Sequence, residues 1–192
     1  MKIFKSVFML LVLCAVAYPQ TENLGMGAFS NDKGAIMLAV DASLVIQDMN
    51  SPYVMFIIYM AARDSNQNIV VGRDGIVMVY NGQEYKMPSL QGLRKNYNGE
   101  IRDINLYRLL GKEGIMSSWL RLYEFPASGD FFPPLTLWAQ VKTDEGSMYN
   151  FIGFRTKCYF KNPGFKKGDK LILKVVAKNK PELTGEVEIT LK

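Results

Sequence analysis

The amino-acid sequence predicts an all-β protein, built as an antiparallel β-sandwich with one short helical or irregular insertion. Three observations lead to this fold class. Apolar and polar residues alternate with a period of two over many short segments, as in strands that bury one face. Turn-forming residues separate these segments at short, regular intervals, which is typical of antiparallel sheets. One internal stretch, residues 88–118, shows no clear period and is where the insertion is expected.

Two segments in the first third of the chain predict long strands. Residues 36–47 alternate, with one face much more apolar than the other, and we interpret them as a single strand. Residues 53–62 are apolar on both faces, as expected for a central strand that is covered on both sides.

A hairpin is predicted shortly afterwards. The turn signal at residues 72–75 separates strand-like residues 69–71 from residues 76–80. Asn81-Gly82 then precedes the polar strand 83–87. Since both turn residues tolerate a positive φ, this pair is a strong hairpin signal.

The middle of the chain is less regular. Residues 88–98 are expected to form a loop or a single helical turn, and residues 100–110 a short helix or a further strand, of which we favour the helix. The remaining alternating segments predict strands at residues 119–125, 135–141, 152–160, 170–177 and 186–191.

The chain from Lys167 to Leu191 resembles the closing hairpin of many bacterial immunoglobulin-like modules. In both, a Gly-Asp pair (here Gly168-Asp169) leads into a strand and a glycine (here Gly185) precedes the last one. The resemblance implies a sandwich of immunoglobulin-like or jelly-roll type, and it implies no activity.

Residues 1–17 are predicted to be a signal peptide that is removed. Lys2 and Lys5 supply a basic start, and an apolar run of about ten residues follows, roughly half of what a membrane-spanning helix needs. Ala15-Val16-Ala17 offers the small-x-small cleavage pattern. We therefore expect residues 18–192 to form one exported domain that does not span a membrane, periplasmic or secreted from a bacterial cell.

The composition and charge of the chain limit the kinds of binding partner that are expected. The chain is 48% hydrophobic and 21% charged with a net charge of +5, which makes no case for a nucleic-acid partner. Positive charge gathers in residues 155–192, which fits either an anionic partner or a solvated, lysine-rich edge that discourages aggregation. Cys14 lies in the predicted signal peptide and is expected to be removed with it. Cys158 is then the single cysteine, and no intramolecular disulfide can form.

The sequence argues against most kinds of catalysis. It contains no histidine, which excludes Ser-His-Asp and Cys-His systems and histidine-ligated metals, and no cofactor is predicted. Cys158 falls on an apolar strand face and is expected to be buried and inert. Ser30-Asn31-Asp32-Lys33 matches a Ser-x-x-Lys motif but lacks the helix that this chemistry requires.

Carboxylates leave one enzymatic alternative open. A glycan hydrolase needs two acids facing each other across a cleft. No spacing selects a pair among the candidates, which are Asp41, Glu84, Glu100, Asp103, Glu124 and Asp130.

Aromatic and basic residues form the constellation that we consider a candidate ligand-binding face. On the predicted strands Trp138 points away from the apolar face, Trp119 and Tyr123 flank Arg121, and Phe151 and Tyr159 share a face with Arg155 and Lys157. Flat aromatic rings stack on sugars and anchor protein interfaces. The alternative is that another segment covers these rings and turns them into a second small core.

These observations favour a non-catalytic binding or interaction module of the bacterial envelope or secretome. Its expected partner is a glycan or an envelope protein. Two alternatives remain at this stage: a carboxylate-based glycan hydrolase, and an envelope assembly or chaperone-like subunit that pairs through an exposed edge strand.

Overall fold

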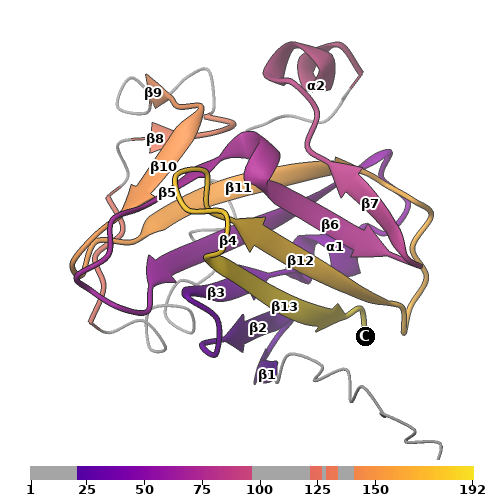
Figure 1. Ribbon diagram of the computed structural model, residues 1–192. Helices are drawn as coiled ribbons and strands as arrows, with labels where there is room; N and C mark the ends of the chain where they lie inside the picture. Colours follow the sequence, from indigo (N-terminus) through magenta and orange to yellow (C-terminus); the bar gives the residue numbers. More distant parts are fainter. Residues whose placement is uncertain (1–20, 97–121, 127–128, 134–140) are drawn as a thin grey trace, which may run out of the picture.

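The computed structural model describes residues 21–96, 122–126, 129–133 and 141–192. They are mostly β-structure, and the larger sheets are antiparallel, which confirms the all-β prediction (Figure 1). In chain order the elements are β1 (Glu22–Gly25), β2 (Ala28–Asn31), β3 (Ile36–Asp41), α1 (Ser43–Gln47), β4 (Tyr53–Ala62), β5 (Ile69–Gly72), the 3-10 turn η1 (Arg73–Gly75), β6 (Ile76–Tyr80), β7 (Gln83–Lys86), α2 (Leu90–Asn96), β8 (Gly129–Asp130), β9 (Val141–Lys142), β10 (Glu145–Met148), β11 (Phe154–Lys161), β12 (Lys170–Val176) and β13 (Thr184–Thr190).

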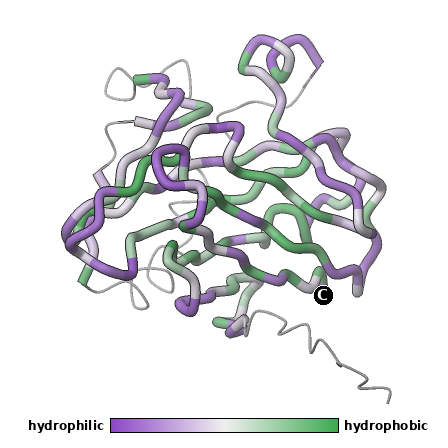
Figure 2. The backbone as a smooth tube through the Cα atoms, in the orientation of Figure 1, coloured by the Kyte–Doolittle hydropathy of each residue, from purple (hydrophilic) through white to green (hydrophobic). Residues whose placement is uncertain are grey.

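Two sheets carry most of the described strands. One has the order β1-β2-β3-β4-β11 and the other β13-β12-β6-β7, and β13 contacts β2 and β3 of the first sheet. Side chains from both sheets belong to one hydrophobic core. Figure 2 shows the apolar residues along these strands and the hydrophilic residues in the turns and α2. Among the described residues, no helix is long and apolar enough to cross a membrane.

The predicted central strand and hairpin are confirmed. In β4 every residue after Tyr53 is buried, and the strand pairs with both β3 and β11. Asn81 and Gly82 join β6 to β7 with φ values of 49° and 77°. The sequence predicted these two features well because they depend on local composition and on local backbone torsions.

The single long strand expected at residues 36–47 is wrong. The strand β3 ends at Asp41 and the short helix α1 begins at Ser43. The buried Asp41 carboxylate accepts a hydrogen bond from the Ser43 backbone N–H at 2.9 Å. This local bond takes a donor away from the sheet, so the alternation continues in the sequence while the strand stops.

The middle of the chain agrees with its prediction only in part. Residues 90–96 form α2, where a loop or helical turn was expected. The predicted strand 119–125 is wrong over the part that the structure describes, where Glu124 makes an isolated bridge to Ile152. Residues 100–110 and most of 135–141 lie outside the described residues.

Two glycines face each other where β13 of one sheet meets the other sheet. A Cβ atom on Gly34 would lie 2.7 Å from the Thr184 carbonyl oxygen, and one on Gly185 would collide with the carbonyl of Ile36. The Asn31 side chain also donates a hydrogen bond across this contact to the Glu186 carbonyl oxygen at 2.7 Å. A side chain at Gly185 would therefore push β13 away from β3.

Gly185→Ala is expected to lower the free energy of unfolding by about 1–3 kcal/mol, the usual cost of overpacking. Gly72→Ala is the matched control, since its Cβ would meet nothing closer than the Lys178 Cδ atom at 3.7 Å. That control should leave stability unchanged or raise it by up to about 1 kcal/mol. Urea denaturation measures both, and an equal effect of the two substitutions would contradict the close sheet contact.

Hydrogen bonds to Asp169 join the β11–β12 connection to β6 of the four-stranded sheet. One oxygen of Asp169 accepts hydrogen bonds from the Lys166 backbone N–H and from the Tyr80 hydroxyl, each at 2.7 Å. These donors lower the pKa of Asp169, the Lys166 N–H most and the Tyr80 hydroxyl next. The Tyr80 ring packs edge-on against Phe165 at 4.9 Å.

Because the folded state lowers the pKa of Asp169, its stabilising contribution is present above the unfolded pKa of about 3.9 and is lost as the pH falls through the folded value. Asp169→Asn should therefore destabilise most near neutral pH, and the difference from wild type should shrink in acid. Tyr80→Phe removes one of the two donors and should show a weaker form of this dependence. Denaturation curves between acid and neutral pH test it, and a pH-independent difference for Asp169→Asn would contradict it.

Candidate functional site

A buried ion pair lies on the face of β11 that was expected to be an open platform. The Lys157 side chain is 3% exposed and the Asp130 side chain 6%, with Lys157 Nζ 3.4 Å from Asp130 Oδ2. Lys157 comes from β11 and Asp130 from the short strand β8, which contacts it. A buried lysine needs such a partner, because an unpaired charge is costly to remove from water.

The second oxygen of Asp130 is held by three donors. Asp130 Oδ1 accepts hydrogen bonds from the Phe132 backbone N–H at 3.0 Å, from the Thr156 hydroxyl at 3.0 Å and from the Lys157 backbone N–H at 3.3 Å. Within the described residues β11 is the last strand of its sheet. The carboxylate of Asp130 thus satisfies an edge N–H that would otherwise lack a strand partner.

Aromatic side chains from the same short segment pack on β11. Phe132 packs edge-on against Tyr159 with ring centroids 5.1 Å apart, and Phe131 packs on Phe154 at 5.2 Å. Phe131 and Phe132 are fully buried and Tyr159 is 1% exposed. The guanidinium of Arg73 lies over the Phe132 ring at 5.0 Å. The segment that carries Asp130 therefore covers the edge of β11 and packs on both of its faces, with Phe132 on the face of Tyr159 and Phe131 on the face of Phe154.

The expectation of an exposed platform is wrong at Lys157 and Tyr159, because residues 129–132 cover both side chains. Arg155 lies at the border of this covered region, with its guanidinium 5.8 Å from the Tyr59 ring centre. Trp119, Arg121 and Trp138 lie outside the described residues.

Two of the predicted aromatic residues do come together at the surface. Tyr123 and Phe151 pack edge-on with ring centroids 6.0 Å apart. Phe151 is 53% exposed. Tyr123 is partly buried, donates a hydrogen bond from its hydroxyl to the Ala62 carbonyl oxygen at 3.1 Å, and has a pKa raised by that burial.

Sequence reasoning missed Tyr149, which lies on the same tight turn as Phe151. Backbone hydrogen bonds in both directions join Tyr149 and Ile152, and Asn150 between them has a φ of 50°. The Tyr149 side chain is 44% exposed. The available signal was Asn150, since asparagine tolerates this left-handed conformation and marks turns.

Tyr149 lines a hollow of about 400 Å³ between β9, β10 and the start of β11. The exposed Val141, together with Phe154 and Pro126, supplies further apolar surface. Lys142 and Ser147 add polar groups. We call this feature the aromatic hollow.

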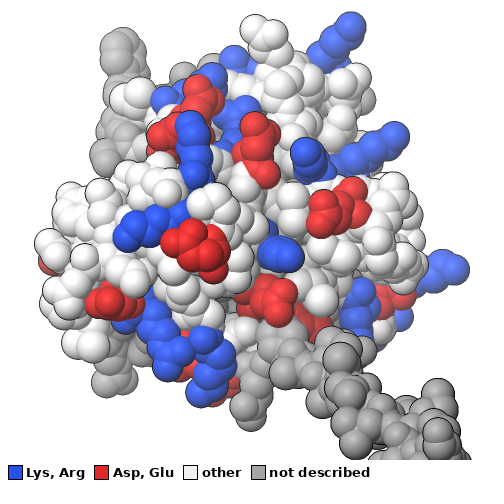
Figure 3. All heavy atoms as spheres, viewed as in Figure 1, with Lys and Arg blue, Asp and Glu red and all other residues white. Residues whose placement is uncertain are grey.

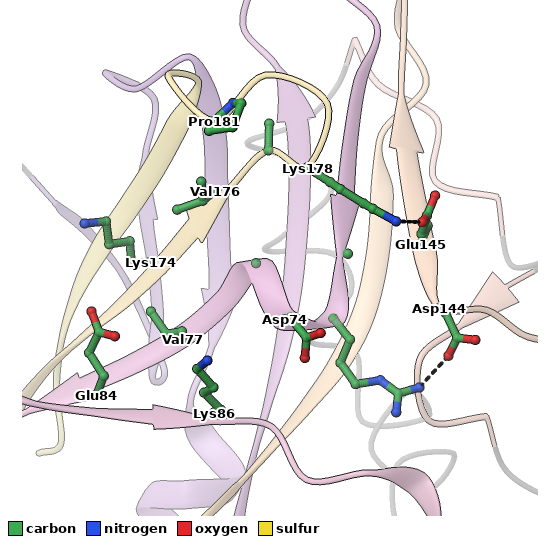
Figure 4. Close-up of a pocket in the computed structure, with 14 residues that line it drawn as sticks. Asp74, Val77, Glu84, Lys86, Asp144, Glu145, Lys174, Val176, Lys178 and Pro181 are labelled. Carbon is green, nitrogen blue, oxygen red and sulfur yellow. Dashed lines mark hydrogen bonds and ion pairs between the residues drawn. The ribbon is translucent and has the colours of Figure 1, made fainter.

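A larger hollow of about 710 Å³ lies on the other side of β10, and we call it the charged hollow (Figure 4). Charged side chains of both signs line it, namely Arg73, Lys86, Lys174 and Lys178 with Asp74, Glu84, Asp144 and Glu145. Figure 3 shows Lys and Arg interspersed with Asp and Glu over this face. Its charge is therefore mixed, with neither sign dominant.

Two ion pairs cross the rim of the charged hollow. Arg73 Nη2 lies 3.1 Å from Asp144 Oδ1, and Lys178 contacts Glu145 (Figure 4). The hydrogen bond to Glu145 raises the pKa of Lys178. Glu145 lines the aromatic hollow as well, so the two hollows adjoin at this residue.

The candidate acids are scattered and partly used by the fold. Asp41 holds the start of α1, and Asp130 belongs to the buried pair. Glu84 lines the charged hollow, whereas Glu124 is exposed on the segment beside Ile152. Glu100 and Asp103 lie outside the described residues.

The remaining candidates for catalysis lie in unsuitable surroundings. Cys158 is fully buried as predicted, and burial raises the pKa of its thiol well above the ordinary value. Ser30 is buried in β2 while the Lys33 side chain is 64% exposed beyond the strand. Within the part of the chain that the structure describes, no group of three or more His, Cys, Asp or Glu side chains could hold a metal ion.

Lys157→Met is expected to lower the free energy of unfolding by about 3–5 kcal/mol, because it leaves the Asp130 carboxylate buried without its cation. Lys174→Met on β12 is the matched control and should change stability by no more than about 0.5 kcal/mol. Chemical denaturation measures both. Equal, small effects would show that the Asp130 carboxylate does not depend on Lys157.

No protein-family model, curated protein sequence or solved structure matches this chain. The chain's own geometry is therefore the basis of the functional argument.

Proposed function

We propose that this chain is an exported, non-catalytic binding module of the bacterial envelope or secretome that recognises a glycan through the aromatic hollow. An envelope protein is the alternative partner. In this proposal the two facing sheets form an open β-sandwich related to immunoglobulin-like or jelly-roll folds, and the turn that carries Tyr149 and Phe151 projects from one end of it.

The observation that carries the proposal is the exposure of two aromatic rings on one rigid turn. Tyr149 is 44% and Phe151 53% exposed, although a soluble protein gains by burying such rings. Backbone hydrogen bonds also hold the two central residues of the turn, from Asn150 N–H to the Ser65 carbonyl and from Glu124 N–H to the Phe151 carbonyl. Rings that are already held in place lose little conformational entropy when a ligand binds.

The surroundings of these rings suit a sugar. The apolar face of a pyranose stacks on an aromatic ring, and its hydroxyl groups need polar partners at the edges. Lys142 and Ser147 line the aromatic hollow together with Tyr149, and Phe151 lies two residues further along the same turn. Glu145 lines both the aromatic and the charged hollow. The mixed signs of charge there provide both donors and acceptors for a ligand that extends beyond one ring.

Two observations argue against the alternatives. The acids Asp144 and Glu145 at the two hollows are engaged in ion pairs with Arg73 and Lys178, which is a poor arrangement for a pair of hydrolytic carboxylates. The edge of β13 already interacts with Thr21, whose hydroxyl accepts a hydrogen bond from the Glu188 N–H at 2.9 Å. A partner strand would have to displace this contact.

Tyr149→Ala and Phe151→Ala are expected to weaken glycan binding by about tenfold or more each, the loss that corresponds to about 1.4 kcal/mol. The mature protein would first be screened on an array of neutral and acidic oligosaccharides. Titration calorimetry with a bound oligosaccharide would then compare the variants.

Met26→Ala provides the matched control, because it removes a side chain that is 66% exposed from the β1–β2 turn. It should bind as wild type does. If the array shows no ligand, or if both turn variants keep wild-type affinity, the aromatic hollow is not a glycan site. Binding of an envelope protein that survives both substitutions would point to another face of the molecule.

A further inference from the structure

The buried pair of Lys157 and Asp130 has the arrangement of two groups that can react with each other. We infer that Lys157 and Asp130 condense to an intramolecular isopeptide bond, which joins β11 to β8 covalently. This inference is independent of the proposed glycan binding.

The first argument is proximity. Lys157 Nζ lies 3.4 Å from Asp130 Oδ2, an oxygen of the carboxyl group that it would attack, and also 3.4 Å from the Phe132 carbonyl oxygen, so two acceptors hold the nitrogen next to this group. Both side chains extend from elements that pack against each other. Reactive groups that are fixed at this separation gain much of the advantage of an intramolecular reaction.

The second argument is the environment of the other carboxylate oxygen. Asp130 Oδ1 accepts hydrogen bonds from the Phe132 N–H, the Thr156 hydroxyl and the Lys157 N–H. When a nitrogen adds to the carboxyl carbon, negative charge develops on this oxygen. Donors that are already directed at that oxygen stabilise such a charge, as in an oxyanion hole.

The third argument is the exclusion of water. The Lys157 and Asp130 side chains are 3% and 6% exposed, and Phe132 and Tyr159, which pack on each other, are 0% and 1% exposed. Burial of an ammonium and a carboxylate is costly, whereas the amide that they form carries no net charge. The enclosure therefore favours the condensed product and protects it from hydrolysis.

The reaction balances without any other reactant. Lys157 first passes a proton to Asp130 Oδ2, and the neutral amine then attacks the carboxyl carbon. The new carbon–nitrogen bond forms, the bond from the carboxyl carbon to Oδ2 breaks, and Oδ2 leaves as water. Of the three ammonium protons, one stays on the amide nitrogen and two depart with the water. No oxidation or reduction takes place.

Such a bond would stabilise the folded chain, in which no intramolecular disulfide can form once the predicted signal peptide is removed. Cys158 is the single cysteine beyond the predicted leader, and it is buried. A covalent link between β8 and β11 closes the chain between residues 130 and 157 and constrains the unfolded state, as a disulfide does. It also fixes the segment that covers Tyr159.

Intact-mass spectrometry of the denatured, mature protein tests the inference. Wild type should be lighter than its calculated mass by one water molecule, and a proteolytic digest should contain a branched peptide that joins Asp130 to Lys157. Lys157→Arg keeps a cation at this position but cannot form the bond under these conditions, so it should have its full calculated mass. Lys174→Arg is the control and should still lack one water.

Two results would overturn the inference. The first is a folded wild-type protein at its full calculated mass, with Asp130 and Lys157 in separate peptides. The second is a water loss that persists in Lys157→Arg and maps to Asp74-Gly75, because an Asp-Gly pair can lose water by closing on its own backbone.

Discussion

The buried contact between Asp130 and Lys157 is the constraint on which one side of the molecule depends. The lysine on β11, the last described strand of its sheet, can be buried only if its charge is matched, and a short segment brings the matching carboxylate. The same carboxylate accepts backbone hydrogen bonds from Lys157 and Phe132, so it also satisfies the strand edge that it covers. Phe131 and Phe132 are buried as a consequence. One polar interaction thus allows a short segment to pack over β11, the last described strand of the five-stranded sheet.

This buried region is connected to the surface through Arg73. The guanidinium lies over the Phe132 ring, donates a hydrogen bond to the Phe131 carbonyl at 3.4 Å and pairs with Asp144 at the rim of the charged hollow. The next residue, Glu145, belongs to both hollows and pairs with Lys178. The shape of the candidate site therefore depends on the packing beneath it. Under the proposed function, such a preformed surface would suit recognition of a ligand with fixed geometry.

The candidate site could be predicted only in part. Alternation grouped Phe151 with Arg155, Lys157 and Tyr159, but Phe151 lies in the turn before β11, and the alternation does not reveal which other segment lies over a strand face. Residues 129–132 cover Lys157 and Tyr159 and leave Phe151 exposed. Tyr149 was missed because it belongs to a turn, where the period of two carries no information. The partner of Lys157 is 27 residues away in the chain, beyond the reach of any local pattern.

The sequence by itself determined the all-β class, the buried strand β4, the Asn81-Gly82 hairpin, the alternating strands β12 and β13, and the burial of Cys158. These features follow from side-chain periodicity and backbone torsions, which act between near neighbours. The tertiary structure alone decided where β3 stops, which strands face each other across Gly34 and Gly185, and which aromatic rings reach solvent. Each of these depends on a packing or hydrogen-bond partner that the fold supplies and that the local alternation does not identify.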